Sequence, residues 1–569
     1  MSRWAKFLIC AGAGLLALFC GLLVPAHLRA VDSSLVRRAG LNTVGPVAEG
    51  IHLAHEGDLG AVRVLQGYAT QAQLAGRDQL DISVARLVAL HPDWLRWGGG
   101  DAQLESLFDS GSAGSDPEPL THFIIRLENR NRILDFLNSS PVSAVHDVLR
   151  TRALTRTTIF SASSSAAGQA FDAAVSICGL LLADGKLTPS LGSAMRALAR
   201  QANQGDSSQP FEESLMDLLS LGQRMNWDQL TVFVAHIDDP RTLHVLADQV
   251  RRHQDKLATL FTVVAVSAKP GAIAQYLLNF SQSGLNDLDY AARCGTGGLD
   301  ELLARNQPLY VAAWRQSIIS QTPAAGFFNV AVECCRRTPL LALVWKWLFY
   351  LVSGFLLALA MHFARPVVSS WERPLQVRGF HLAREVLFAL GFLLVVLLAS
   401  EPFLAQDSQK TEFAFRLRLP MAGGTVPAGK SGADSSFMNH QVLLTMLLFF
   451  VLQALLYVAC IVKLAEIRRQ RVGSRIKLKL LENEDHLFDA GLYLGFVGTI
   501  ISLILVSVGV FKQPSLMAAY SSTSFGIIFV SAFKIFHLRP ARRKLLIESE
   551  TASTDAVEPI AASPVTASV

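Results

Sequence analysis

Near its C-terminal end the chain reads AGLYLGFVGTIISLILVSVGV over residues 490–510 and LMAAYSSTSFGIIFVSAFKIF over residues 516–536. Both segments are apolar and about as long as the roughly 20 residues that cross a hydrocarbon core. Lipid tails are as apolar as Leu, so membrane helices associate through close backbone contact and hydroxyl hydrogen bonds. The small and hydroxylated residues recur at helical spacing, which predicts a membrane hairpin. Its candidate helix-packing or pore-facing positions are Gly491, Gly495, Gly498, Thr499, Ser502, Ser522, Thr523 and Gly526.

The whole composition agrees with a membrane protein. Hydrophobic residues make up 51% of the 569 residues and charged residues only 17%, which is too apolar for a soluble protein of this size. Besides the hairpin, four more apolar runs approach spanning length, and the third run of the chain is interrupted by Glu401 and Pro402. The six runs cover residues 7–25, 340–363, 386–405, 442–462, 490–510 and 516–536. The predicted fold is therefore an all-α polytopic membrane protein with about six spans.

The basic residues predict the orientation of these spans. The net charge of +5 is small, and Arg and Lys gather beside apolar runs, which is typical of topology signals and not of a nucleic-acid surface. If every run spans, the basic segments before run one, after run two, after run four and after run six share one side, the cytoplasm. Region 31–338 and loop 406–441 are then extracytoplasmic, and the C-terminus is cytoplasmic. The excess of Arg over Lys fits a bacterial chain.

Two features of the N-terminal half stay open at this stage. Residues 1–30 are either a retained membrane anchor, which the length of the apolar run favours, or a cleaved signal peptide ending at Leu28-Arg29-Ala30. Cys178 or Cys294 either forms a disulfide in the extracytoplasmic region or stays a buried thiol, and the absence of any paired spacing favours the thiol.

Region 31–338 reads as helices of 10 to 18 residues with apolar residues three and four apart, and Pro or Gly breaks punctuate it. This predicts a large helical, solenoid-like domain, although no strict repeat is present. Segments 173–183 and 257–268 are apolar but too short to span, so we expect buried core helices. Residues 339–405 would hold spans two and three, and residues 442–546 spans four to six with a basic cytoplasmic loop. The tail 547–569 is rich in Ala, Ser and Thr and is predicted to be disordered.

Motifs for catalysis or cofactor binding lack a supporting context. Residues 424–431 read GTVPAGKS, which fits the phosphate-loop pattern, but the loop between the flanking spans is too small for a nucleotide-binding domain. His52, His55 and Glu56 read HxxHE, which is no metalloprotease order, and a solvated helix end before Gly57 explains it better. We therefore assign no catalytic residue, metal or cofactor. Glu401 and Lys534 are the ionisable groups nearest the membrane interior, either as functional groups or as residues that reach the interface.

The hairpin also carries a resemblance. LGFVGTI at residues 494–500 resembles the LGLLGTV stretch of the MotA/TolQ/ExbB proton-channel family, and STSFGII at residues 522–528 is similar to the family's ALLATAIGL stretch. The resemblance implies an oligomeric ion-conducting stator in the inner membrane that works with a single-span periplasmic partner. It also implies that Thr499 and Thr523 face the pore and that the span at residues 442–462 matches the family's first helix. The basic residues from Arg539 to Lys544 would begin the cytoplasmic tail.

Three functions follow as hypotheses. The first is an ion-channel or stator-type component, a homo-oligomer in the lipid bilayer, whose extracytoplasmic domain binds other membrane or periplasmic proteins. The second is a membrane-anchored scaffold that binds partners without transport. The third is an envelope enzyme, which would need a pocket lined by His52, His55 and Glu56. No nucleic acid is expected as a partner.

Overall fold

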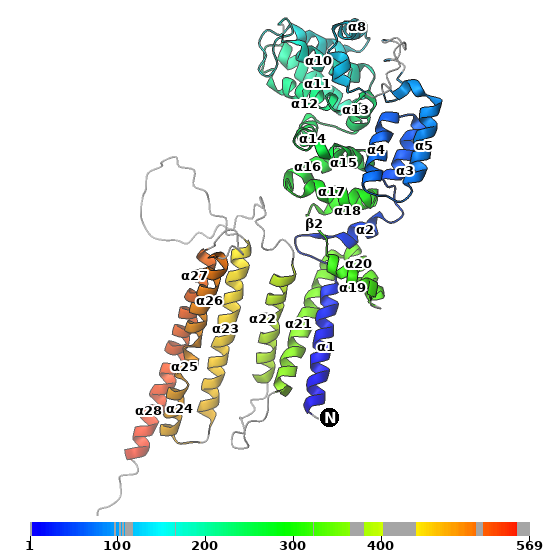
Figure 1. Cartoon of the computed structure of the whole chain (residues 1–569). Coiled ribbons are helices and arrows are strands. Elements are labelled where there is room, and N and C mark those ends of the chain that lie inside the picture. Colours follow the sequence, from blue (N-terminus) through cyan, green and yellow to red (C-terminus); the bar gives the residue numbers. More distant parts are fainter. Residues whose placement is uncertain are drawn as a thin grey trace, which may run out of the picture. The chain divides into compact units, whose positions relative to one another are not determined.

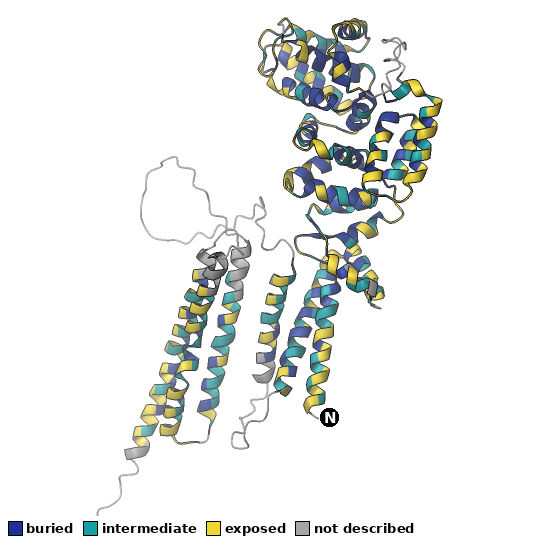
Figure 2. Ribbon diagram, viewed as in Figure 1, coloured by how far each residue is buried: buried dark blue, intermediate teal, exposed yellow. Residues whose placement is uncertain are grey.

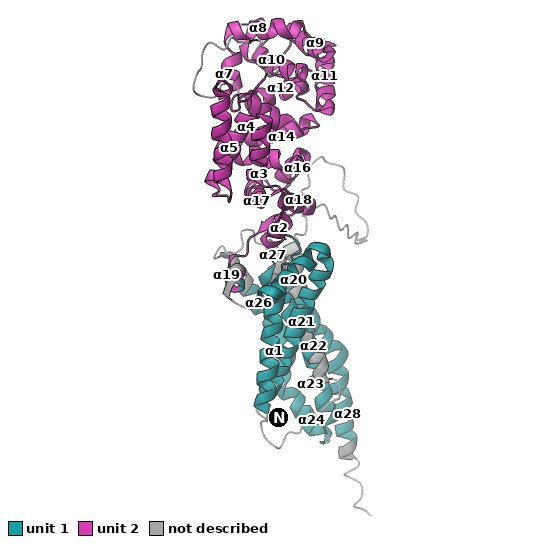
Figure 3. Cartoon of the chain, turned by 90° about the vertical axis from the view of Figure 1, so that its right-hand side faces the viewer, with its two compact units in different colours: residues 1–29, 319–569 teal, residues 30–318 magenta. Residues whose placement is uncertain are grey.

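The fold is nearly all-α (Figure 1). The computed structural model describes residues 3–95, 98–101, 104, 107, 118–165, 167–321, 324–364, 380–401, 440–470, 472–507 and 516–554. Contacts divide the chain into two compact units, residues 30–318 and residues 1–29 together with 319–569 (Figure 3). We call them the helical unit and the membrane-helix unit and describe each by itself.

The helical unit contains short helices joined by tight connections. In its first part they are α2 (Ser33–Gly40), α3 (Pro46–Glu56), α4 (Leu59–Gln71), α5 (Arg77–Leu90), η1 (Pro92–Leu95), α7 (Leu120–Ile124), α8 (Leu127–Asn138), α9 (Ser143–Arg150) and η2 (Thr151–Ala153). Then follow α10 (Gln169–Ala183), α11 (Pro189–Asn203), α12 (Gln209–Gly222), α13 (Trp227–Val234), α14 (Pro240–Arg252), η3 (Gln254–Lys256), α15 (Leu257–Ser267), α16 (Pro270–Asn279), α17 (Gly284–Arg293), α18 (Thr296–Arg305) and α19 (Ala313–Gln321).

Local sequence explains several helix starts in this unit. Asp239 accepts a hydrogen bond from the backbone N–H of Thr242 at 2.8 Å, and Pro240 occupies the first turn of α14. Asn226 and Gln229 form a reciprocal capping box at the start of α13. Gly295 adopts a φ of +97° just before α18, a backbone conformation that glycine reaches without a steric penalty.

The core of the helical unit contains the two apolar segments that were too short to span. From Phe171 to Leu181 every residue of α10 is buried, and α15 buries Leu260 to Val264. The prediction of core helices at 173–183 and 257–268 is confirmed. Figure 2 shows the same pattern across the unit, with buried residues on the inner faces of the helices and exposed residues outside.

Both ends of the helical unit's chain pack against each other. β1 (Val31–Asp32) pairs in parallel with β2 (Leu309–Tyr310), and the Arg315 guanidinium donates to the Asp32 carboxylate. Helix α2 contacts α18, and α4 contacts α13 and α15. Alternate helices also touch, since α10 packs on α12, α12 on α14 and α14 on α16. The two-residue strands were not predicted, because their pairing joins segments nearly 280 residues apart in a sequence without strand alternation.

The membrane-helix unit begins with α1 (Arg3–Leu23) and resumes after the helical unit. Its other helices are α20 (Ala325–Arg337), α21 (Pro339–Ala364), α22 (Phe380–Ser400), α23 (His440–Arg469), α24 (Ser474–Asn483), α25 (Asp485–Phe488), α26 (Ala490–Ser507), α27 (Leu516–Phe533), the π-helical turn η4 (Lys534–Leu538) and α28 (Arg539–Thr554). Helices α1, α21 and α22 pack in sequence, α22 contacts α23, and α23 packs with α26 and α27.

Within the described residues, four helices are long and apolar enough to cross a membrane: Arg3–Leu23, Pro339–Ala364, Phe449–Arg469 and Tyr520–Thr551. The chain is thus consistent with a membrane protein. The runs at 386–405 and 490–510 also form helices, α22 and α26, and their full length as spans stays a prediction because the structure describes them only in part.

The tail corrects one expectation. Disorder was predicted from residue 547, but α28 continues to Thr554. Its earlier turns are anchored by the buried Ala541 and Leu545, and a nucleated helix adds further residues at little cost. Residues 555–569 lie outside the described part.

Candidate functional site

The hairpin of α26 and α27 brings its small residues into direct backbone contact. A Cβ atom on Gly495 would lie 2.8 Å from the carbonyl oxygen of Ser522, and a Cβ on Gly526 would lie 2.7 Å from the carbonyl oxygen of Gly491. A Cβ on Gly498 would lie 2.5 Å from the Ser522 hydroxyl. These distances are too short for any side chain, so the glycines allow the two helices to cross closely.

Three hydroxyl groups converge on one backbone oxygen in this contact. The carbonyl of Gly495 accepts from Thr499 Oγ1 at 3.0 Å, from Ser522 Oγ at 3.0 Å and from Thr523 Oγ1 at 3.3 Å. The Thr499 and Thr523 hydroxyl oxygens also lie 2.6 Å apart, and either can be the donor. Thr499 is 8% exposed and Ser522 1%. We call Gly495, Thr499, Ser522 and Thr523 the hydroxyl seam.

The structure therefore places seven of the eight sequence-predicted positions at the hairpin contact or beside it. Ser502 lies on α26, but its side chain is outside the described residues.

Lys534, just beyond α27, pairs with Asp489 at 2.7 Å, and the two side chains are 40% and 30% exposed. This half-exposed pair fits the expectation of a residue that reaches the interface.

Gln453 is a member of this site that the sequence analysis missed. It comes from α23, is 1% exposed and donates through Nε2 to the carbonyl of Gly491 at 2.9 Å. Its Oε1 atom has no hydrogen-bond partner among the described residues. The sequence did contain one indication of this contact, because Gln453 is a single amide side chain inside the apolar run 442–462. The Gln453 side chain thus joins α23 to the glycine face of α26.

A buried charged cluster lies at one end of α21 and α22. The Lys346 ammonium is 2.6 Å from Glu401 Oε1, and His27 Nδ1 is 3.6 Å from Glu401 Oε2. The side chains of Lys346, Glu401 and His27 are at most 2% exposed. Glu401 was a sequence candidate. Lys346 was overlooked because it sits inside the apolar run 340–363, and His27 because nothing in the sequence joins it to Glu401.

The same cluster fixes the chain that follows α1. Lys346 also donates to the carbonyl of Ala26 at 2.6 Å, and the backbone N–H of Leu28 donates to Glu401 Oε2 at 2.9 Å. A buried ion pair is tolerated when hydrogen bonds satisfy its remaining donors and acceptors. Residues 26–28, from the segment that could have been a signal peptide, supply those hydrogen bonds.

The helical unit has its own carboxyl pair, in which Asp228 is buried and Asp58 is half-buried. Asp228 Oδ2 accepts from the backbone N–H of Ala61 at 2.8 Å at the start of α4. Burial, followed by the charge of neighbouring Asp58, raises the pKa of Asp228 well above the usual carboxyl range. Burial likewise raises the pKa of Asp58, although its hydrogen bond with Asp228 opposes the shift. One proton shared by the two carboxyls explains their stable contact.

The remaining motifs gain no support as sites. His52 and Glu56 lie on the exposed side of α3, with side chains 66% and 53% exposed, which confirms a solvated helix end. A nearby cleft of about 200 Å³ is lined by Leu59, Gly60, Arg63 and Asn226 among others, and none of the HxxHE residues lines it. Among the described residues, no group of His, Cys, Asp and Glu could hold a metal ion. The GTVPAGKS segment lies outside the described residues.

None of the seven cysteines, all of which lie in the described residues, forms a disulfide bond. Cys178 is fully buried inside α10. Burial raises the pKa of its thiol to about 12, so the reactive thiolate is suppressed. Cys294, the other candidate for a disulfide, also has a pKa raised by burial.

Comparison with known proteins adds no relative: no family model, curated protein or solved structure matches this chain. The resemblance to MotA/TolQ/ExbB proteins stays a prediction that rests on the quoted hairpin segments.

Proposed function

We propose that the chain is a multi-pass inner-membrane protein and that its α26–α27 hairpin lines an ion path in a homo-oligomer, as a channel or stator-type component resembling MotA/TolQ/ExbB proteins. In this proposal the C-terminus is cytoplasmic and the solenoid-like helical unit is extracytoplasmic, where it binds a partner protein.

The observation that carries the proposal is the crowding of donors at the hydroxyl seam. A carbonyl oxygen has two lone pairs, yet three hydroxyls point at the Gly495 oxygen, two of them also 2.6 Å from each other. These hydrogen bonds cannot all form at once. The Thr499 and Thr523 hydroxyls therefore have alternative partners and can exchange them by rotation, which is the property required of groups that pass a proton or replace an ion's water shell.

The test is ion flux through the purified full chain in lipid vesicles. Replacing Thr499 and Thr523 with Val keeps the side-chain shape and removes both hydroxyls, so flux should be abolished while the oligomer on size-exclusion chromatography is unchanged. The matched control is Ser524→Ala, which removes an exposed hydroxyl whose one hydrogen bond among the described residues lies within its own helix, to the Tyr520 carbonyl at 3.0 Å. Wild-type flux in the double variant would refute the proposal.

A second candidate, a membrane-anchored scaffold without transport, is favoured by the closeness of the helix contact. Gly491, Gly495, Gly498 and Gly526 leave no space for a side chain between α26 and α27, and close packing is a sufficient reason for such faces. This candidate predicts no flux in the wild type and a lower melting temperature for the Thr-to-Val double variant. Ion flux through the wild type therefore separates the candidates.

A further inference from the structure

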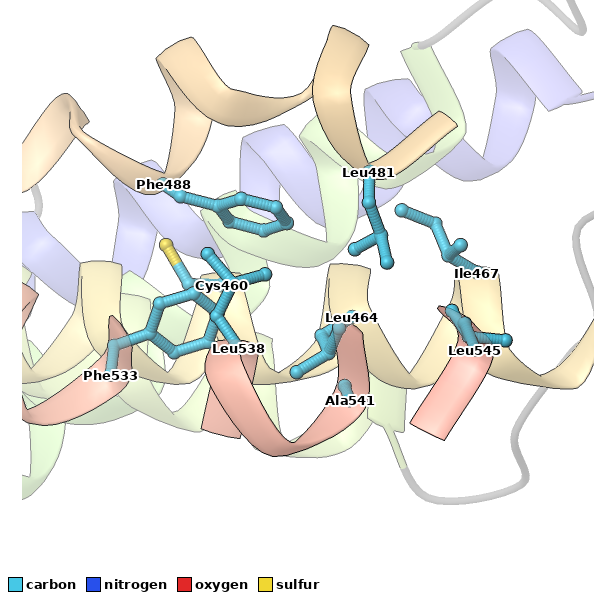
Figure 4. Close-up of a cluster of buried hydrophobic side chains, with 9 residues drawn as sticks. All are labelled: Cys460, Leu464, Ile467, Leu481, Phe488, Phe533, Leu538, Ala541 and Leu545. Atoms are coloured by element: carbon cyan, nitrogen blue, oxygen red, sulfur yellow. The ribbon is translucent and has the colours of Figure 1, made fainter. Parts of the chain in front are cut away.

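The ends of α23, α24 and α28 next to the apolar spans carry a dense set of basic residues. Glu466 is the single acidic residue from Lys463 to Leu481. These three helices are held together by a buried apolar cluster (Figure 4), which consists of Cys460, Leu464, Ile467, Leu481, Phe488, Phe533, Leu538, Ala541 and Leu545. The basic residues are therefore displayed on a packed structure and not on a loose loop.

These basic residues fall into two groups. Those that face other helices are paired: Lys463 lies 3.6 Å from both Glu466 and Glu484, and Arg542 lies 3.2 Å from Asp485. The second group is exposed, and none of its members forms an ion pair with another residue that the structure describes. We call this group the basic collar: Arg468, Arg469, Arg475, Lys479, Arg539, Arg543 and Lys544.

The cluster places most of the collar at a similar level along the bundle. Figure 4 shows Ile467, Leu481 and Leu545 close together at one end of the cluster. Collar residues are sequence neighbours of all three, because Arg468 follows Ile467, Lys479 is two residues from Leu481 and Lys544 precedes Leu545. Three helices thus bring their positive charges to one band.

The distance of this band from the apolar spans matches a lipid headgroup layer. At about 1.5 Å per residue, Arg468 lies about 9 Å beyond the apolar run that ends at residue 462, and Arg543 about 10 Å beyond the run that ends at residue 536. Headgroups extend about 5–7 Å beyond each side of the hydrocarbon core, and long Arg and Lys side chains reach back toward it. The charges lie within about one Debye length of the phosphates.

We propose that the basic collar binds the phosphate groups of anionic phospholipids in the adjacent leaflet. Unpaired guanidinium and ammonium groups on a rigid surface attract such lipids by about 1 kcal/mol, or about fivefold, for each side chain near the surface. The binding rests on α23 and α27 spanning a bilayer and is independent of ion flux through the hydroxyl seam.

The test uses the detergent-solubilised full chain, mixed with equal amounts of phosphatidylglycerol and phosphatidylcholine, and counts retained lipids by native mass spectrometry. The wild type should retain phosphatidylglycerol preferentially. The variant Arg539→Gln/Arg543→Gln/Lys544→Gln should lose about tenfold to 100-fold of that preference. Preserved helix content and melting temperature would show that the variant is folded.

The matched control has the same change of net charge in the helical unit, Arg86→Gln/Arg132→Gln/Arg156→Gln, at three exposed positions. It should retain phosphatidylglycerol as the wild type does. A second collar variant, Arg468→Gln/Arg469→Gln, should reduce retention if the α28 variant fails to fold. Equal retention of both lipids by the wild type, wild-type retention in the collar variants, or an equal loss in the control would overturn the proposal.

Discussion

Breaking the buried Lys346–Glu401 pair should destabilise the membrane-helix unit more than any surface charge does. The Lys346 ammonium donates to Glu401 at 2.6 Å and to the carbonyl of Ala26 at 2.6 Å, and the carboxylate accepts from the N–H of Leu28 at 2.9 Å. Lys346→Met removes the positive charge and leaves the carboxylate buried, with only His27 and the N–H of Leu28 as its partners among the described residues. Removing one partner of a buried ion pair costs about 3–5 kcal/mol.

Replacing both partners should recover most of that loss. In Lys346→Met/Glu401→Leu both charges of the ion pair are removed, and apolar pairs of similar volume are often as stable as the ion pair. The carbonyl of Ala26 and the N–H of Leu28 still lose their partners. Backbone groups left without a partner cost about 1–3 kcal/mol, so we expect the double variant to lie between the wild type and Lys346→Met.

The assay is SDS-induced unfolding of the full chain in mixed micelles, followed by circular dichroism. The matched control is Lys534→Met, which breaks a Lys–carboxylate pair of almost the same length, 2.7 Å, whose side chains are 40% and 30% exposed. Exposed pairs contribute at most about 1 kcal/mol. If Lys346→Met costs no more than Lys534→Met, or if the double variant is as unstable as the single one, the reasoning is refuted.

Three further predictions concern other parts of the chain. Gly495→Ala should destabilise the hairpin by about 1–3 kcal/mol through overpacking, measured by the same SDS titration. The control is Gly12→Ala, which should be neutral or slightly stabilising because no atom lies within 4 Å of the new Cβ. The pKa of Asp228 is raised in the folded chain, so the stability that the group contributes is present below the ordinary carboxyl pKa of 3.8 and is lost as the pH rises through the raised value. Hydrogen exchange in α13, corrected for intrinsic rates, should therefore become less pH-dependent in Asp228→Asn. Glu212 is buried and accepts from the N–H groups of residues 158–160, at 2.6–3.1 Å, so Glu212→Gln should cost about 1–3 kcal/mol and speed exchange in that segment.

The sequence predicted the elements whose causes are local. Helical spacing of apolar residues and Pro-led helix starts such as Asp239-Pro240 depend on neighbouring residues, and α14 begins where they indicate. The hairpin faces were predicted for the same reason, because Gly491, Gly495 and Gly526 recur at helical spacing within two adjacent segments. Their contact follows once the helices pair.

The missed features all join segments far apart in the chain. Glu401 was visible as a charge at the end of an apolar run, but its partners are 55 and 373 residues away. Composition alone cannot pair a lysine with a carboxylate at such separations. The β1–β2 pairing and the contact of Gln453 with α26 were missed for the same reason. Burial of a polar side chain signals a partner, and only the fold identifies it.

The two polar sites in the membrane-helix unit differ in a way that bears on function. At Glu401 each carboxylate oxygen has its own donors, and Lys346 bridges it to the Ala26 carbonyl. Such a cluster has one good arrangement, so it holds residues 26–28 in place. At the hydroxyl seam three hydroxyl protons face four hydrogen-bond contacts, so more than one pattern of hydrogen bonds is possible. Conduction needs groups that change partners, and anchoring needs groups that do not. Under the proposed function, loss of the seam hydroxyls should change flux, whereas loss of a charge in the cluster should change stability.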